Sequence, residues 1–447
     1  MLQKDIDSLV IPSTSASQSA DRIMLFEMAI YGHHAVYIRH LVRYWCEQAL
    51  PGYFYIVVTA QFITECADVV AIAQQYPQAN VSFLPLSKAE EATLTQDPSS
   101  FIQRKARAWQ EWNLMCSYAK RLQATHCFLA SFDFFQWPFL FAQKPPCPIS
   151  SIYFKPTFHY ASFSGYEPTL KSRAQQWQEK TLLAAILQKP YLHRLLCLDP
   201  FVVKALNQTK NQPKAVALAD PVEVYNAQTS SQTSSQASSQ ASSQAISQIS
   251  LSELRSHLKI ESQRKIFLLF GELTERKGVE QVLEAIALLS VEQCQQLCFL
   301  LVGRCELAIQ RRFQSKIAQV CQIRPAQIVE QYGFVSQQAV QDYFRLSDVV
   351  LAPYQKHVGM SGILLQAAAA QKPVLSSNYG LMGEMVRRYQ LGLAVDTTQP
   401  TEIAAAITLL LKEPASNFYS VEKTRQLVEQ NTIEKFAAAI FSAVRNQ

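Results

Sequence analysis

Charge and glycine are both scarce in this sequence. Charged residues make up 17% of its 447 residues, and only 12 residues are glycine. Apolar residues make up 49%, which together with the low charge is the composition of a globular protein. The net charge of +6 is compatible with phosphorylated ligands or an anionic membrane surface. It is too diffuse to indicate a nucleic-acid partner.

Several familiar signatures are also missing. None of the ten cysteines forms a C-x-x-C pair, and the N-terminal stretch has no secretory apolar region, so free thiols in a reducing cytoplasm are predicted. No apolar run is long enough to span a bilayer. No set of His, Cys and Asp has metal-ligand spacing, and no Walker loop, G-x-G-x-x-G or G-x-S-x-G motif occurs. We therefore expect neither a metal nor a cofactor.

The length and one repetitive stretch define the expected domains. A chain of 447 residues exceeds what one hydrophobic core usually organises, so two domains are expected. The Ser/Gln repeat at 228–250 has almost no apolar content to offset the entropy of ordering it, which predicts a flexible insert. The expected divisions are a disordered tail at 1–20, an N-terminal domain at 21–225, a low-complexity linker at 226–262, and a C-terminal domain at 263–447 whose last helices are free to pack back on the N-terminal domain.

Short apolar strands alternate with helical segments in both halves of the chain. In the second half, strand patterns such as "KIFLLF" (265–270) and "QLCFLLVG" (296–303) are each followed by an amphipathic helix pattern. This alternation is typical of βαβ units and a parallel sheet. The fold class predicted is α/β with two Rossmann-like, doubly wound domains. Strand candidates in the first half are 22–30, 54–60, 81–86, 126–131, 150–155 and 215–225.

The glycines gather where a ligand would bind. Nine of the twelve fall between Gly271 and Gly392, mostly where a strand ends or a helix begins, and in doubly wound folds that edge of the sheet is the ligand edge. In "GMSGILLQAAAAQKPVLSS", Ser361 is a plausible N-cap, and Gly362 leaves the first amides of the helix uncovered. Those amides and the helix dipole favour a phosphate. Lys277 in "ERKG" would lie on the same edge. The alternatives are close helix–sheet packing for the glycine and a solvated surface lysine.

The ordered motifs of residues 264–412 resemble a known family. "FLLFGELTERKG", "LLVGR", "YGFVS", "LSDVVLAPY", the Gly-rich helix start and "GLMGEMV" are similar, in order and spacing, to the nucleotide-sugar-binding domain of GT-B glycosyltransferases. The likeness is to the retaining, glycogen-synthase-like group (family 4, or "group 1"). In the first half, "YGHHAVYIRHL" resembles the start of the acceptor domain. The resemblance implies two Rossmann-like domains that face a cleft.

The resemblance also assigns residues to a donor site. Lys277 would neutralise the donor diphosphate, and Gly359, Ser361, Gly362 and Ile363 would form the helix start that holds it. The remaining implied donor-binding residues are Phe334 and Val335 at the nucleobase, Gln366 at a ribose hydroxyl, and Glu384 after a glycine.

Two histidines are candidates for contact with the reacting groups. His33 follows Gly32 at the expected strand-to-helix turn of the first domain, beside His34. His357 precedes the glycine-rich helix start. The alternative for His33 and His34 is that they simply begin a helix, and for His357 that it is a loop histidine without a role.

The motif departs from the family at three positions. The family's E-x7-E glutamates are replaced by Val358 and Gln366, and Glu272 stands where the family has an arginine. The resemblance implies transfer of a sugar from a nucleoside-diphosphate sugar to a hydroxyl of a saccharide, lipid or small molecule, with retention and without a metal. Peripheral membrane contact stays open. The alternatives are a catalytically degraded scaffold that binds a nucleotide sugar or a protein partner, and a 2-epimerase.

Overall fold

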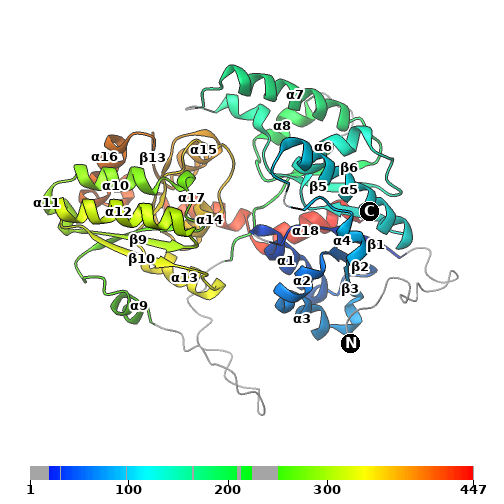
Figure 1. Ribbon diagram of the computed structural model, residues 1–447, viewed down its shortest axis with the longest axis horizontal. Helices are drawn as coiled ribbons and strands as arrows, with labels where there is room; N and C mark the ends of the chain where they lie inside the picture. Colours follow the sequence, from blue (N-terminus) through cyan, green and yellow to red (C-terminus); the bar gives the residue numbers. More distant parts are fainter. Residues whose placement is uncertain are drawn as a thin grey trace, which may run out of the picture. The chain divides into compact units, whose positions relative to one another are not determined.

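The computed structural model describes residues 20–30, 32–96, 98–163, 166–208, 213–223 and 250–445 (Figure 1). The contacts of the chain divide it into two compact units. Unit 1 contains the described residues of 20–159, 168–221 and 433–445, and unit 2 contains those of 160–167 and 222–432. Residues 1–19 of the expected tail and 226–249 of the expected linker lie outside the described residues. Residues 251–257 of that linker form a helix, which begins with a capping box between Ser250 and Glu253.

Unit 1 is built on one seven-stranded sheet in which all pairings are parallel, in the order β3-β2-β1-β4-β5-β6-β7. Its strands are β1 (Arg22–Phe26), β2 (Tyr53–Val58), β3 (Val81–Pro85), β4 (His126–Leu129), β5 (Ile149–Tyr153), β6 (Leu192–Cys197) and β7 (Ala215–Ala217). Its helices are α1 (His33–Glu47), α2 (Ala60–Glu65), α3 (Ala67–Gln75), α4 (Lys88–Ala92), α5 (Phe101–Arg121), α6 (Phe132–Phe141), α7 (Leu170–Ile186), α8 (Val202–Asn207) and α18 (Ile433–Val444), with a short 3-10 turn at Pro77–Ala79. A second 3-10 turn, Thr157–Ser162, begins in unit 1 and ends in unit 2.

Helices cover both faces of this sheet (Figure 1). The strands are buried on both sides, as their nearly continuous apolar runs require in a parallel sheet. One face packs against α1, α3 and α18, through residues such as Tyr37, Val69 and Phe436. The other face packs against α5, α6 and α7, through residues such as Trp112 and Phe139. Helix α18 therefore completes the core of a unit whose other elements all precede residue 222.

Unit 2 has a six-stranded parallel sheet in the order β10-β9-β8-β11-β12-β13. Its strands are β8 (Lys265–Phe270), β9 (Leu297–Gly303), β10 (Gln327–Tyr332), β11 (Val349–Ala352), β12 (Val374–Ser377) and β13 (Gly392–Val395). Its helices are α9 (Leu251–His257), α10 (Val279–Leu288), α11 (Val291–Gln295), α12 (Leu307–Ile323), α13 (Gln337–Leu346), α14 (Gly362–Ala369), α15 (Gly380–Tyr389), α16 (Pro400–Lys412) and α17 (Val421–Gln430), with 3-10 turns at Glu275–Lys277 and Ala415–Asn417.

Each sheet reverses its strand order beside its first strand. In unit 1 the chain moves outward from β1 through β2 and β3, and then returns to place β4 on the other side of β1. In unit 2 the same reversal places β11 next to β8, on the side opposite β9. A crevice forms at such a switch point, outside the carboxyl ends of the two central strands, and ligands of doubly wound folds bind there. The predicted fold class, two Rossmann-like α/β domains, is confirmed.

Candidate functional site

Lys277 lies at the switch point of unit 2, in the loop that follows β8. Its side chain is only 5% exposed, and its ammonium donates to the backbone oxygen of Phe270 at 3.0 Å and to the hydroxyl of Tyr354. The ammonium also lies 4.3 Å from the centre of the Tyr354 ring. Among the described residues, no carboxylate forms an ion pair with Lys277. A buried cation without a counter-ion favours an anionic ligand.

Helix α14 begins at the other side of the same switch point, after β11. Ser361 caps it as expected, because its Oγ accepts from the backbone N–H of Ile363 at 3.4 Å. The same hydroxyl donates to the Tyr354 hydroxyl at 3.0 Å. Tyr354 therefore connects Lys277 to the cap of α14, so that the cation and the first helix amides are held together.

Gly362 has no structural reason to be glycine. A Cβ built on it meets no atom of the described residues within 4 Å, and its backbone is not in the left-handed region that favours glycine. This contrasts with Gly380 and Gly383 at the start of α15. There a Cβ would lie 2.8 Å from the oxygen of Val358 and 2.1 Å from the oxygen of Asn378, respectively. The packing explanation for Gly362 is therefore wrong, and open access to the amide of Gly362 remains.

The loop before α14 places His357 next to this group. Its Nδ1 lies 3.1 Å from Nη1 of Arg276, and its Nε2 lies 3.2 Å from the backbone oxygen of Met360. Because a guanidinium only donates and a carbonyl only accepts, the proton resides on Nε2. Both ring nitrogens thus have protein partners, and a role of His357 at the sugar stays a prediction.

The remaining donor-binding candidates line other parts of unit 2. Phe334 follows β10 and is 77% exposed, with the guanidinium of Arg304 lying 5.3 Å from its ring centre. Such an exposed ring beside an arginine can stack on a nucleobase. Glu384 is half-buried on α15 and pairs with Arg387 at 3.7 Å. The other candidates are Gly359, which is buried, and Val335, Ile363 and Gln366, which are partly exposed.

His33, the catalytic candidate of unit 1, stacks on other rings. Its ring centre is 4.2 Å from that of His34 and 4.6 Å from that of Phe154. Loss of solvent around the ring, followed by the nearby charges of His34 and Lys155, lowers the pKa of His33 to about 3. His33 is absent from the lining of the cavity at the switch point of its unit, whereas His34 belongs to it. His33 thus does not line this cavity, and its role at the reacting groups stays a prediction.

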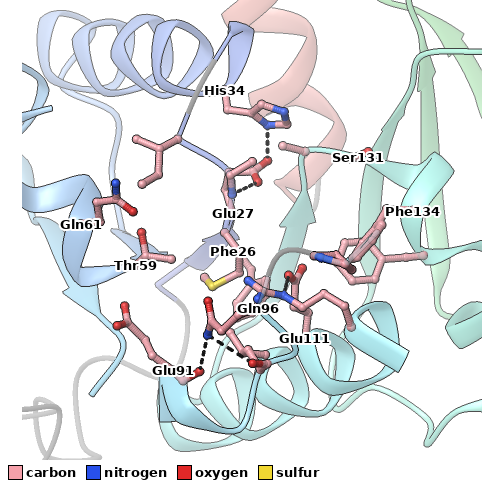
Figure 2. Close-up of a pocket in the computed structure, with 18 residues that line it drawn as sticks. Phe26, Glu27, His34, Thr59, Gln61, Glu91, Gln96, Glu111, Ser131 and Phe134 are labelled. Atoms are coloured by element: carbon pink, nitrogen blue, oxygen red, sulfur yellow. Dashed lines mark hydrogen bonds and ion pairs between the residues drawn. The ribbon is translucent and has the colours of Figure 1, made fainter. Parts of the chain in front are cut away.

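That cavity has a volume of about 620 Å³ and lies at the carboxyl ends of β1, β2 and β4 (Figure 2). Its charged groups come from the loop after β1 and from helices α1, α4 and α5. Apolar side chains of β1, of the loop that follows it and of α6 form much of the wall. The lining residues are Phe26, Glu27, Met28, Ala29, Ile30, His34, Thr59, Gln61, Glu91, Leu94, Gln96, Pro98, Arg107, Glu111, Ala130, Ser131, Phe134 and Phe135.

Glu27 is the residue directly after β1, and its carboxylate is only 8% exposed. One oxygen accepts from the backbone N–H of Ala29 at 2.7 Å, and the other lies 2.8 Å from Nδ1 of His34 (Figure 2). Burial works against protonation of His34, but the hydrogen bond and the negative charge of Glu27 outweigh it and raise the pKa of His34. The pair is therefore an ion pair when His34 carries its proton.

Glu111 is the second buried carboxylate of the cavity, 7% exposed, and it accepts from Nε of Arg107 at 2.5 Å. Burial raises the pKa of Glu111 to about 7, with Arg107 opposing the shift and the charge of Glu27 adding to it. Arg107 also donates to the backbone oxygen of Thr95 at 2.8 Å. Two carboxylates thus face one cavity, each with its own cationic partner.

Several of these residues have only weak signals in the sequence. Glu27 was hidden inside the apolar run "RIMLFEMAI", and Glu111 inside a long polar helix where a glutamate ordinarily faces solvent. Tyr354 was detectable, because it follows the strand "VVLA" by two residues and so lies on the ligand edge. Arg276 stands directly before Lys277 in the quoted "ERKG".

No helix in the described part of the chain combines the length and the apolar character that crossing a bilayer requires. The described His, Cys, Asp and Glu side chains also form no group of three or more that could hold a metal ion.

Comparison with solved structures identifies the fold. Proteins of similar architecture include the Anabaena protein HepE in complex with UDP, with a TM-score of 0.61, 11% identity, and coverage of 94% of this chain and 98% of that one. Sucrose-phosphate synthase of Thermosynechococcus elongatus gives a TM-score of 0.60 at 15% identity, covering 94% of this chain and 98% of that one. An α,α-trehalose-phosphate synthase (UDP-forming) of Burkholderia xenovorans, in complex with glucose-6-phosphate, gives 0.58 at 11% identity, covering 95% and 100%. The chain has the GT-B fold.

Comparison of sequences adds the family. Residues 252–435 match the family "Glycosyl transferases group 1". A stretch of 75 residues, 17% of this chain, is 36% identical to the D-inositol 3-phosphate glycosyltransferase of Rhodococcus opacus (strain B4). That match spans 16% of the relative's length. The chain thus has the GT-B fold, and its residues 252–435 match the group 1 glycosyltransferases, the family that its motifs resemble.

Proposed function

We propose that this protein transfers a sugar from a nucleoside-diphosphate sugar, bound by unit 2, to a hydroxyl of an acceptor received by unit 1. The observation that supports the proposal is the arrangement of residues at the switch point of unit 2. A buried lysine that has no carboxylate partner among the described residues is tied through Tyr354 to a helix start at which no side chain covers Gly362. Both features favour a diphosphate.

The proposed chemistry follows from the charge that develops on the leaving group. As the glycosidic bond of the donor breaks, negative charge grows on the departing diphosphate. Lys277 and the amide of Gly362 would stabilise that charge without a metal, because they are already oriented before the reaction begins. The first donor to test is UDP-glucose, since HepE was solved with UDP and with UDP-glucose. Retention of the anomeric configuration belongs to the proposal on the family resemblance alone.

A thermal-shift screen against UDP-, GDP- and ADP-glucose tests the donor site. A ligand at a hundred times its dissociation constant should stabilise the protein by about 2.7 kcal/mol, which gives a readable increase in melting temperature. The donor that binds is then incubated with candidate hydroxyl acceptors, and release of the nucleoside diphosphate is measured. Absence of binding by all three donors would contradict the proposed function.

A binding scaffold without transferase activity is the second candidate. The observation in its favour is the sequence at the donor helix, where Val358 and Gln366 replace the two glutamates typical of the family. The backbone oxygen of Val358 accepts from the N–H of Leu381 at 3.1 Å, so this residue also holds the start of α15 in place. Donor binding without turnover for any acceptor would favour the scaffold over the enzyme.

The expected cytoplasmic location stays part of the proposal. The ten cysteines are free thiols, and eight of them are buried. Buried free thiols are typical of proteins from reducing compartments.

A further inference from the structure

The side chains that line the cavity of unit 1 indicate which kind of ligand it can bind. It lies at the switch point of the unit, where doubly wound folds bind their ligands, and its volume of about 620 Å³ falls within the usual range for small-molecule sites. Within this unit it is the counterpart of the position that Lys277 occupies in unit 2. The proposed function leaves open what the acceptor is, so the walls of this cavity are informative.

The polar part of the wall is rich in hydrogen-bond acceptors. Glu27 and Glu91 present carboxylates, which accept hydrogen bonds but donate none when ionised (Figure 2). Glu111, with its pKa raised to about 7, presents a carboxyl group that accepts hydrogen bonds and, when protonated, also donates one. The side chains of Thr59, Gln61, Gln96 and Ser131 are neutral and both donate and accept. Such a wall recognises a ligand with several hydroxyl groups.

Apolar side chains supply the rest of the wall. Met28, Ile30, Leu94, Phe134 and Phe135 all face the same cavity. Aromatic and aliphatic surfaces pack against the C–H faces of sugars and polyols, whose hydroxyls point away from those faces. Hydroxyl acceptors on one side and apolar surface on the other fit a compact, hydroxyl-rich molecule.

The charges of the cavity disfavour a phosphate. Of the described lining residues, two can be cationic, and both are engaged by carboxylates: Arg107 by Glu111 and His34 by Glu27. Glu91 adds a further negative charge, and one of its oxygens accepts from the backbone N–H of Ala60 at 2.8 Å. A phosphate would lie beside these carboxylates, and each cation that it could contact is already paired with one of them, which is a repulsive arrangement.

We infer that the acceptor received by unit 1 is an uncharged polyhydroxyl compound, such as a free sugar or cyclitol, and not a sugar phosphate. The inference rests on the proposed transfer reaction and deepens it. It also separates this chain from relatives whose names specify phosphorylated ligands, inositol 3-phosphate in one and glucose-6-phosphate in another.

Two matched ligand pairs test the inference on the full chain: glucose against glucose 6-phosphate, and myo-inositol against inositol 3-phosphate. Binding is measured by saturation-transfer NMR with titration, which detects millimolar affinities. We expect the uncharged member of at least one pair to bind, and at least about tenfold more tightly than its phosphate. Glu27→Gln should weaken binding of that member several-fold, while Glu47→Gln, on the exposed end of α1, should leave it unchanged.

Several results would overturn the inference. They are equal or tighter binding of a phosphate, binding of neither member of either pair, or insensitivity to Glu27→Gln. Tighter binding of glucosamine than of glucose by more than about tenfold would also overturn it, in favour of a cationic ligand. If the Glu27→Gln variant does not fold, which its melting curve will show, the matched pairs on the unaltered protein decide the question.

Failure here is distinguishable from failure of the proposed function. Donor binding is measured separately with UDP-glucose and should respond to Lys277→Ala but not to Glu27→Gln. Binding of a free sugar without any donor binding would contradict the proposed reaction, but it would still support an uncharged polyhydroxyl ligand for the cavity of unit 1. Donor binding with preference for a sugar phosphate would remove only the inference about the acceptor.

Discussion

The two units share the same strand order around their first strand, but the buried charged side chains at their switch points have opposite sign. In unit 2 the buried group is Lys277, without an ion-pair partner in the described part of the chain, beside a helix start at which Gly362 has no side chain to cover its amide. In unit 1 the buried groups are the carboxylates Glu27 and Glu111. The fold thus determines where a ligand can bind, and a few residues at the strand ends determine which charge that ligand may carry.

The largest expected effect tests the open helix start. Gly362→Val should reduce donor binding by at least about a hundredfold, because a branched side chain would cover the helix start that the diphosphate needs to reach. The stability cost should stay below about 1 kcal/mol, since a Cβ at this position meets nothing within 4 Å. Calorimetric titration and thermal melting measure the two quantities.

Gly383→Ala is the matched control for that variant. A Cβ there would lie 2.1 Å from the oxygen of Asn378, so this variant should lose stability instead. If Gly362→Val binds the donor normally, the helix start is not a phosphate site, and the contrast between the two units loses its main support.

The buried carboxyl group of Glu111 in unit 1 predicts that the stability of the protein depends on pH. Burial raises the pKa of Glu111 to about 7 from 4.5, so the folded protein binds more protons than the unfolded chain between these values. Stability contributed by the protonated carboxyl is therefore present below about pH 4.5 and is lost as the pH rises through about 7, by up to roughly 3 kcal/mol.

Glu111→Gln removes this titration. Relative to the unaltered protein, the variant should be more stable at pH 8 than at pH 5, and chemical denaturation at both values measures the difference. Glu47→Gln, which replaces an exposed glutamate, should show no such change. If the stability difference between the Glu111→Gln variant and the unaltered protein is the same at pH 5 and pH 8, Glu111 is ionised at both values, with Arg107 as its permanent partner.

Removal of the buried cation should have a smaller effect on donor binding than blocking the helix. Lys277→Ala is expected to weaken donor binding by about 2 kcal/mol, within the range for hydrogen bonds to charged groups. Lys265→Ala is the control, because that ammonium donates to the backbone oxygens of Leu410 and Leu411 from the other end of β8. Unchanged calorimetric affinity of the Lys277 variant would contradict a charge-based donor site.

The smallest effect concerns the link between cation and helix. Tyr354→Phe keeps the ring beside Lys277 but removes the hydroxyl that Lys277 and Ser361 share. The expected loss in donor affinity is about 1 kcal/mol, because Lys277 keeps its bond to the oxygen of Phe270. A loss as large as that of Lys277→Ala would show that the hydroxyl itself contacts the donor.

The contrast between the units also explains what the sequence could predict. Apolar strands and the glycines after them are local signals, and they located the sheet of unit 2 and the positions of Lys277 and Ser361 correctly. Strand β6 was not predicted, because His193 and Arg194 interrupt its apolar run. The expected last strand of the N-terminal domain, 215–225, is shorter in the structure, where β7 ends at Ala217.

The cavity of unit 1 was the harder part because its chemistry is non-local. Glu27 and Glu111 come from a strand end and from the middle of a helix, and only the folded chain brings them to one cavity. His33 and His34 are equivalent by sequence position, and only the helix start of α1 determines which of them faces Glu27. Contacts of this kind cannot be derived from spacing along the chain.

Helix α18 has a consequence for how the protein is made. Phe436, Ile440 and Phe441 belong to the same core as Ile23 and Leu25 of β1, and Ser150 on β5 donates to the backbone oxygen of Ala443 at 2.9 Å. A ribosome releases the chain from its N-terminus onward, so unit 1 would have to wait, with one sheet face incompletely covered, until unit 2 has been synthesised. Unit 2 is then the first to complete its core, although its residues come later in the sequence. During that interval the uncovered apolar face is a site where chaperones can bind and where aggregation can begin.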